Sequence, residues 1–304
     1  MKIFNYFKYL TKNILINFAI IIIVVFLLHF TFASMLINDY NITQSFQYIA
    51  NILIFKYGTV KSQSNVDVTK LYSTYFGNTI YLVSTSFIIS FVIGFYLAYL
   101  LARKNKAISL KSINIAIFIF SSVPIFILGP IAIIFNKTLN LPTVFIDLYI
   151  GNYWETFLSI ITPVVILSLV VIPLVVGFNY SSLKEIIQSE YYSWAKANGV
   201  SNHKIFWNVV FRNWISSGLQ KIVFIYIYLV TYSMIIERFF YIPGQSFIFQ
   251  YLNNPDYLNL LMYSILMNIT LIFLIKSITD LIVYILDIKK VYTIVRIGGY
   301  KWKK

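Results

Sequence analysis

Apolar residues are concentrated in six runs, each near or above the ~20 residues that a helix needs to cross the hydrocarbon core of a bilayer. The segments between these runs carry most of the charged side chains. This alternation predicts an all-α, polytopic membrane protein with six transmembrane helices. The predicted spans cover about residues 14–36, 75–101, 113–135, 157–178, 216–236 and 259–286.

The first run follows a short basic head, MKIFNYFKYLTK, that resembles the start of a signal peptide. Its apolar stretch is longer than a typical h-region of ~7–15 residues, and no small-residue cleavage site follows cleanly. We therefore expect it to be retained as a membrane helix. The extracytoplasmic segment after it, about residues 37–74, places Phe46, Ile49, Ala50 and Leu53 on one apolar helix face suited to the membrane interface.

The composition agrees with a membrane protein. Of the 304 residues, 59% are hydrophobic and only 11% charged, with a mean hydropathy of +0.78, whereas soluble domains carry about 25% charged residues. The formal net charge is +14. On one side of the predicted topology, segments 2–12, 103–111, 184–212 and 289–304 hold 17 basic residues, and the other side holds 5.

Cytoplasmic loops are the ones enriched in Lys and Arg, so both termini are predicted to be cytoplasmic. The positive charge thus reflects orientation in a cell membrane and gives no indication of nucleic acid as a partner.

The sequence offers little for catalysis or metal binding. It has no cysteine, and its two histidines, His29 and His203, lie far apart. A membrane-embedded enzyme would need paired carboxylates, a His/Asp cluster or a nucleophile with its base, and none is visible. We therefore predict no catalytic residue, no metal site and no cofactor. The chain also lacks the Gly-x-x-x-x-Gly-Lys-Ser/Thr phosphate loop of an ATPase.

The connection between the fourth and fifth spans, about residues 179–215, is far longer than the usual 2–8 residues. Its pattern predicts a helix up to Asn198, a turn at Gly199, and a second helix beginning near Asn202 that Ser201 can cap. Small residues near Tyr191 and Trp194 favour a protein–protein contact. An amphipathic loop resting on the membrane interface is the alternative, and the pattern alone favours neither.

The segment EYYSWAKANGVSNHKIFWNVVFRN, residues 190–213, resembles the EAA loop of the dipeptide/oligopeptide/nickel family of ABC importer permeases, the binding-protein-dependent transport system inner membrane components. Other stretches resemble the same family in the same order: QYIANILIFKYG before span two, SSVPIFILGP in span three, and ERFFYIPGQS after span five. The matching loop positions are Glu190, Tyr191, Ala195, Lys196, Ala197, Gly199, Arg212 and Asn213.

This resemblance implies a type I ABC importer permease fold formed by residues 1–304 as a single domain. It also implies a membrane component that, with a second permease (a heterodimer), forms the pathway for a small peptide. Two cytoplasmic ATPase subunits would bind the loop, and an extracytoplasmic binding protein or lipoprotein would deliver the substrate. The expected ATPase-coupling residues are the eight matching positions together with Trp194.

Prolines in spans three and four can kink their helices, because each removes a backbone hydrogen bond. These spans are therefore candidates to line the pathway. The segment of about 237–258 is expected to break at Pro243–Gly244 and dip back as an extracytoplasmic gate. The pathway and gate candidates are Pro124, Gly129, Pro173, Glu237, Phe240, Pro243 and Gly244.

The chain departs from the family pattern at three positions: Ser193 replaces a basic residue, Ser217 replaces a proline, and Ser246 replaces a glycine. An accessory or sensory membrane protein that retains the permease fold therefore remains an alternative. So does a permease for nickel or a metal chelate, although no ligand cluster points to a metal.

The basic-residue asymmetry generates a topology prediction. Single cysteines at Ser64 and Asn254 should react with an impermeant maleimide in intact cells, and cysteines at Ser109 and Ser201 should not. The absence of native cysteine removes background labelling. Labelling at position 201 from outside would overturn the predicted orientation.

Overall fold

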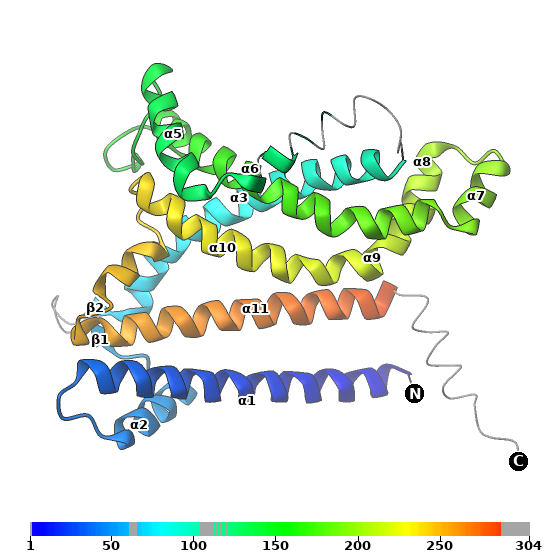
Figure 1. Ribbon diagram of the computed structural model, residues 1–304. Helices are drawn as coiled ribbons and strands as arrows, with labels where there is room; N and C mark the ends of the chain where they lie inside the picture. Colours follow the sequence, from blue (N-terminus) through cyan, green and yellow to red (C-terminus); the bar gives the residue numbers. More distant parts are fainter. Residues whose placement is uncertain are drawn as a thin grey trace, which may run out of the picture. The chain divides into compact units, whose positions relative to one another are not determined.

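The structure is a computed structural model that describes residues 2–60, 66–103, 112, 115, 117–119 and 121–286. It is almost entirely helical, with one short pair of strands (Figure 1). The long helices are α1 (Lys2–Leu36), α3 (Val68–Arg103), α6 (Tyr153–Ile187), α10 (Ile222–Phe239) and α11 (Leu258–Leu286). The shorter elements are α2 (Ile42–Leu53), β1 (Thr59–Val60), β2 (Val66–Asp67), α5 (Ile125–Thr138), α7 (Glu190–Ala197), α8 (Asn202–Ile205), α9 (Arg212–Gly218), the π-helical η1 (Phe206–Phe211), and the 3-10 segments η2 (Leu219–Lys221), η3 (Gln245–Tyr251) and η4 (Pro255–Tyr257).

Five helices of the described chain are long and apolar enough to cross a membrane. They cover Ile14–Leu36, Val68–Arg103, Tyr153–Ile187, Asn202–Phe239 and Pro255–Val283. Each contains or largely overlaps one predicted span, so the all-α membrane architecture is confirmed. Several helices extend beyond the apolar run, because hydropathy marks the part that lies in lipid and not the ends of the hydrogen-bonded helix.

The remaining predicted span, 113–135, lies partly outside the described residues. Its described part is interrupted at Val123 and Pro124, and α5 begins at the next residue. Proline has no backbone N–H and disfavours helical backbone at the residue before it, which accounts for the break. Ser64, Ser109, the basic residues 104–111 and the basic tail 289–304, which contribute to the predicted orientation, lie outside the described residues.

Contacts divide the chain into two compact units, and α3, α6, α10 and α11 contribute residues to both. The first unit comprises Met1–Val83, Ile133–Pro163 and Val230–Leu274, and the second comprises Ser84–Ala132, Val164–Leu229 and Ile275–Lys304. A single permease domain over 1–304 stays a prediction.

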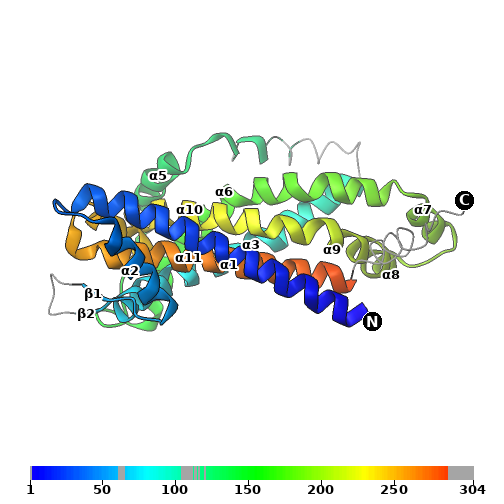
Figure 2. The same ribbon diagram turned by 90° about the horizontal axis from the view of Figure 1, so that it is seen from below.

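In the first unit, α2 packs across the C-terminal half of α1 (Figures 1 and 2). The predicted amphipathic helix therefore exists, with Asn41 capping its start by accepting from the Thr43 N–H. His29 of α1 bonds through Nδ1 to the Ser45 hydroxyl at 2.7 Å and stacks on the Tyr48 ring. Burial raises the pKa of the Tyr48 phenol, so this group stays neutral at physiological pH.

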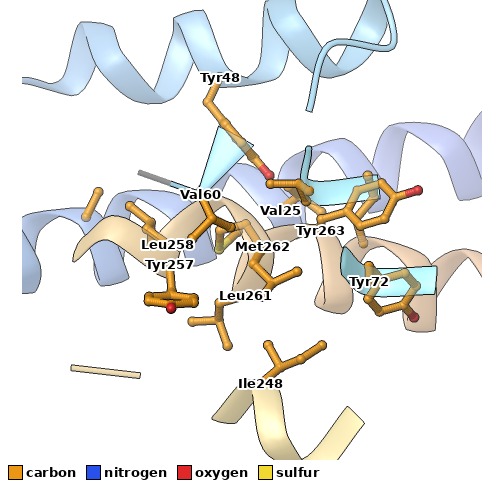
Figure 3. Close-up of a cluster of buried hydrophobic side chains, with 14 of the residues drawn as sticks. Val25, Tyr48, Val60, Tyr72, Ile248, Tyr257, Leu258, Leu261, Met262 and Tyr263 are labelled. Carbon is orange, nitrogen blue, oxygen red and sulfur yellow. The ribbon is translucent and has the colours of Figure 1, made fainter. Parts of the chain in front are cut away.

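The core of the first unit gathers side chains from segments far apart in the sequence (Figure 3). Val25, Tyr48, Val60 and Tyr72 meet residues of η3, η4 and the start of α11, among them Tyr263. The short strands pair antiparallel, Thr59 with Asp67 and Val60 with Val66, which directs Val60 into this core.

In the second unit, α3 and α6 approach closely at Gly94. A Cβ built there would lie 2.7 Å from Val175 Cγ1 and 3.3 Å from the Ile172 carbonyl oxygen. Membrane helices use small residues in this way, because two apolar helices in lipid gain stability from close packing and not from exclusion of water.

We predict that Gly94→Ile lowers the thermal stability of the purified protein by about 1–3 kcal/mol, as for other overpacked interiors. Gly77 lies on the same helix, with nothing within 4 Å of an added Cβ, so Gly77→Ile is the matched control. The midpoints of thermal unfolding in detergent provide the measurement. Equal midpoints for the two variants would contradict the close approach of α3 and α6.

Candidate functional site

The connection between α6 and α8 is the first candidate site. After α6 ends at Ile187, residues 188 and 189 turn the chain and α7 follows as a helix of 8 residues. Its end is closed by hydrogen bonds from the Gly199 N–H to the Lys196 carbonyl and from the Val200 N–H to the Ala195 carbonyl. Gly199 has φ 71°, a left-handed conformation that a Cβ disfavours.

The helix–glycine–helix arrangement predicted for this connection is thus confirmed as local structure, and the second helix begins at Asn202 as expected. Ser201 occupies the position before it, but its side chain makes no capping hydrogen bond. In Figure 1, α7 lies beyond the last turn of α6 and is followed by α8.

The two sides of α7 have different environments. Trp194 is 70% exposed and Tyr191 is 41% exposed, and Glu190, Lys196 and Ala197 are also exposed. Tyr192 and Ala195 point inward and are buried with residues of α3 and α6, including Ala98, Leu101, Ala102 and Leu183.

One expectation is therefore corrected. Ala195 was assigned to the surface that receives a partner, yet its side chain is only 6% exposed and belongs to the interior of this chain. The side chain points inward because the small residue allows α7 to approach the helices of its own chain closely, and a role of Ala195 in ATPase coupling stays a prediction. The exposed surface of α7 is formed by the residues on either side of Ala195 in the sequence.

Buried polar contacts hold the helices from which this connection emerges. The Trp214 indole N–H of α9 donates to Asn179 Oδ1 of α6 at 2.7 Å, and both side chains are buried. The Lys221 ammonium donates to the Phe178 carbonyl and to the Ser182 hydroxyl on α6. These bonds fix the end of α6 against α9.

The structure does not place every predicted coupling residue on α7. Arg212 and Asn213 lie at the start of α9, separated from α7 by α8 and η1. Asn213 donates its amide to the Val209 carbonyl of the preceding turn at 2.6 Å. Arg212 is exposed.

The second candidate site surrounds the carboxylate of Glu237, near the end of α10 in the first unit. Glu237 is fully buried. Its Oε1 accepts a hydrogen bond from the Thr79 hydroxyl of α3 at 2.6 Å, and its Oε2 accepts from the Ser246 backbone N–H at 2.9 Å. The Thr79 hydroxyl in turn accepts from the Gln245 N–H at 2.8 Å. A buried carboxylate without such donors would be costly, so the contacts define its position.

The chain between α10 and η3 wraps around this carboxylate. Tyr241 has φ 53° and ends the helix, and the Phe240 carbonyl accepts from the Phe145 N–H at 2.7 Å. A Cβ on Gly244 would lie 2.3 Å from the carboxyl carbon of Glu237. Glycine is therefore required here by close approach, and its φ of −110° is ordinary.

The Glu237 cluster continues into a chain of amides. Gln245 is buried and donates through Nε2 to the Tyr72 hydroxyl at 3.1 Å, and its Oε1 accepts from Asn268 Nδ2 at 2.8 Å. Asn78 donates to the Pro243 carbonyl at 3.0 Å, and Arg238 donates to the Ser246 carbonyl at 2.6 Å. The helix α10 ends at Phe239, four residues before the predicted break at Pro243–Gly244, and η3 after this turn is partly buried.

The other pathway candidates fall in different surroundings. Pro124 is exposed just before α5, Gly129 is buried within α5, and Pro173 is buried within the continuous helix α6. These three residues belong to the second unit, whereas Glu237 and the turn at Pro243 and Gly244 belong to the first. A role in the pathway stays a prediction for each of them.

The sequence matches the family described as "Binding-protein-dependent transport system inner membrane component" over residues 90–291, about two thirds of the chain. The chain belongs to this family. It is a permease component of an ABC importer, and the resemblance noted in the coupling loop and the later spans is confirmed.

Two curated relatives are similar to this permease over much of their length. One is a "Dipeptide transport system permease protein DppB" of Bacillus subtilis (strain 168), 25% identical over 223 residues that cover 73% of this chain and 70% of the relative. The other carries the same description in Lactococcus lactis subsp. cremoris (strain MG1363). It is 25% identical over 202 residues, which cover 66% of this chain and 64% of that protein.

Several residues of this permease's two candidate sites were not identified from the sequence. Thr79, Gln245, Asn268 and Asn179 are polar residues within or beside apolar helices, and this placement is the signal that could have identified them. Their partners could not have been inferred, because Thr79 and Glu237 are separated by 158 positions in the chain.

We predict that Thr79→Val destabilises the permease by about 1–3 kcal/mol, because it leaves Glu237 Oε1 and the Gln245 N–H without the hydrogen bonds that they make to the Thr79 hydroxyl. Thr79→Ser keeps the hydroxyl and is the matched control. Limited chymotrypsin digestion at the aromatic residues of η3 should accelerate in Thr79→Val and remain unchanged in Thr79→Ser. Identical digestion of both variants would show that the Thr79 hydroxyl does not hold this segment.

Proposed function

We propose that this chain is one of two membrane subunits of an importer for small peptides. In this proposal it forms the pathway with a second, different permease in a bacterial cell membrane, with both termini cytoplasmic. Two ATPase subunits supply the energy from the cytoplasm, and an extracytoplasmic binding protein or lipoprotein delivers the substrate. Peptide as the substrate class is supported by the printed names of the two relatives.

The observation that carries the proposal is the form of α7. It is a short helix with its inner side buried and its outer side exposing Trp194 and Tyr191, and a glycine turn fixes its direction. Large exposed aromatic side chains on a well-packed support are typical of protein–protein hot spots. An ATPase that binds this outer side would push on a helix that is already packed against α3 and α6.

The turn after α10 has the features expected of a gate. It interrupts a helix in a membrane protein, and its backbone groups are bonded by side chains of Thr79, Asn78, Glu237 and Arg238. We propose that η3 lines the extracytoplasmic mouth of the pathway and that the alternation between closed and open states moves this segment. Pro243 and Gly244 give the segment its direction.

A permease for nickel or a metal chelate is less well supported. Within the part of the chain that the structure describes, no group of three or more His, Asp or Glu side chains could hold a metal ion. No observation favours an accessory protein over a transporter, and the experiment below distinguishes the two.

We predict that Trp194→Ala weakens association with the ATPase by about 2 kcal/mol, roughly thirtyfold, as for a Trp hot spot. Because Trp194 is 70% exposed, the variant should fold and insert normally. Gly199→Val should also reduce association, since a branched side chain at φ 71° adds about 1–3 kcal/mol of strain. Co-purification with the ATPase subunits, stimulated ATP hydrolysis and peptide uptake are the measurements.

Tyr149 provides a matched control, because it is an aromatic residue that is 98% exposed and lies outside α7. Tyr149→Ala should bind the ATPase as strongly as the wild type. If Trp194→Ala and Gly199→Val both insert normally and import peptide at the wild-type rate, α7 is not the coupling element. The accessory-protein interpretation would then be preferred.

A further inference from the structure

A cavity of about 580 Å³ lies beside α7 in the second unit. It is lined by Arg103, Ile187, Tyr192, Ser193, Lys196 and Ala197. This volume is within the range of ~300–1,000 Å³ that is typical of small-molecule sites. Two of the lining residues, Lys196 and Ala197, are also among the predicted coupling residues, whereas the exposed aromatic side chains Tyr191 and Trp194 do not line the cavity.

The residues of α7 form three sides of the helix: one that lines the cavity, one that is exposed and one that is buried. Successive helical residues are rotated by roughly 100°, so Ser193 and Lys196 lie roughly 100° around the helix from Glu190 and Trp194. Lys196 follows Tyr192 by four residues and lies on nearly the same side of the helix, and Tyr192 lines the cavity as well. A ligand beside Ser193 and Lys196 therefore leaves the exposed Trp194 side chain uncovered.

The charge of the cavity lining is positive. Among the described residues that line it, Arg103 and Lys196 carry the charged side chains, and within the described part of the chain neither is paired with a carboxylate. One Arg103 nitrogen, Nη2, donates to Asn202 Oδ1 at 3.3 Å, which orients the guanidinium. A guanidinium has five N–H donors in a planar fork that suits phosphate oxygens. An anionic ligand with phosphate chemistry fits these two cations.

The cavity also lies at the ends of two membrane helices. Arg103 is the last residue of α3 and Ile187 is the last residue of α6, and both helices are candidate membrane spans. Basic pockets at the ends of membrane helices are typical sites for anionic lipid headgroups. Ile187 and the Tyr192 ring add apolar surface beside the cations.

An exposed apolar stripe on α3 leads toward this cavity. Ile88, Val92 and Tyr96 are 61%, 62% and 59% exposed. They recur every four residues, and Arg103 follows Tyr96 by seven, so all four lie on one side of the helix. A lipid chain along this stripe would have its headgroup beside Arg103.

We propose that this cavity binds the headgroup of an anionic phospholipid, with Arg103 and Lys196 contacting the phosphate and one acyl chain lying along α3. Ser193 is part of the site because its short side chain leaves the space between the two cations open. The bound lipid holds α7 against the ends of α3 and α6. If α7 couples the permease to an ATPase, as proposed above, coupling depends on anionic lipid.

The test uses the full-length chain purified in an uncharged detergent and analysed by native mass spectrometry with added lipid. Phosphatidylglycerol should bind at one site at least tenfold more tightly than phosphatidylcholine. The double variant Arg103→Gln, Lys196→Gln should lose this preference. Ser193→Phe, which keeps both cations and fills the space, should lose it as well. Arg103→Lys should retain most of it.

Lys204→Gln is the matched control, because Lys204 is an exposed lysine of the neighbouring helix α8 and does not line the cavity. It should bind phosphatidylglycerol as the wild type does. Unchanged preference in both the double variant and Ser193→Phe would overturn the proposal. If millimolar inorganic phosphate displaced the lipid completely, the site would be one for free phosphate and the lipid assignment would be wrong.

A third outcome would assign the cavity to a protein partner. The double variant would then bind phosphatidylglycerol normally but lose ATPase co-purification, which would mean that the cations receive an acidic side chain of the ATPase. Lipid binding is measured without ATPase or peptide. A failure of the lipid proposal is therefore distinguishable from a failure of the proposed transport function.

Discussion

Inside a bilayer, a backbone N–H or carbonyl group has no water to bond, and every interruption of a helix must be compensated by other protein groups. The turn between α10 and η3 meets this requirement through side chains. Glu237 and Thr79 accept from the N–H groups of Ser246 and Gln245, and Asn78 and Arg238 donate to the carbonyls of Pro243 and Ser246. The Glu237 carboxylate is the centre of this arrangement. Its burial is tolerated because both of its oxygens accept hydrogen bonds.

The connection between α6 and α8 is held by local hydrogen bonds of its own. Only α7 lies between α6 and α8. The carbonyls of Lys196 and Ala195 accept hydrogen bonds from the N–H groups of Gly199 and Val200. Asn198 also donates its side-chain amide to the Trp194 carbonyl at 2.9 Å. A compact connection held by such hydrogen bonds suits the coupling role proposed above for α7. The Asn179–Trp214 bond adds a buried polar anchor beneath it.

The sequence predicted the helical membrane architecture because apolar runs of span length are a strong local signal. It also predicted the turn at Gly199, because glycine adopts the left-handed conformation observed there without steric cost. The helix α10 ends at Phe239, earlier than the predicted break at Pro243–Gly244. The inward direction of Ala195 was not predicted, because a small side chain suits contact with another subunit and contact with its own helices equally well. The hydrogen-bonding partners of Glu237 were also not predictable. They come from α3 and from the segment after α10, and only the folded chain brings them together.

Burial of one side of α7 also affects how partner specificity can evolve. Tyr192 and Ala195 are constrained by the interior of the chain, and substitutions there alter folding before they alter recognition. The buried core does not include Glu190, Tyr191 or Trp194. Substitutions at these positions can therefore accumulate as related importers diverge. If the outer side of α7 binds an ATPase, as proposed above, two permeases in one cell would acquire different ATPase preferences by exchanging these outer residues alone. A designed chimaera should graft this outer surface and leave the inner residues in place.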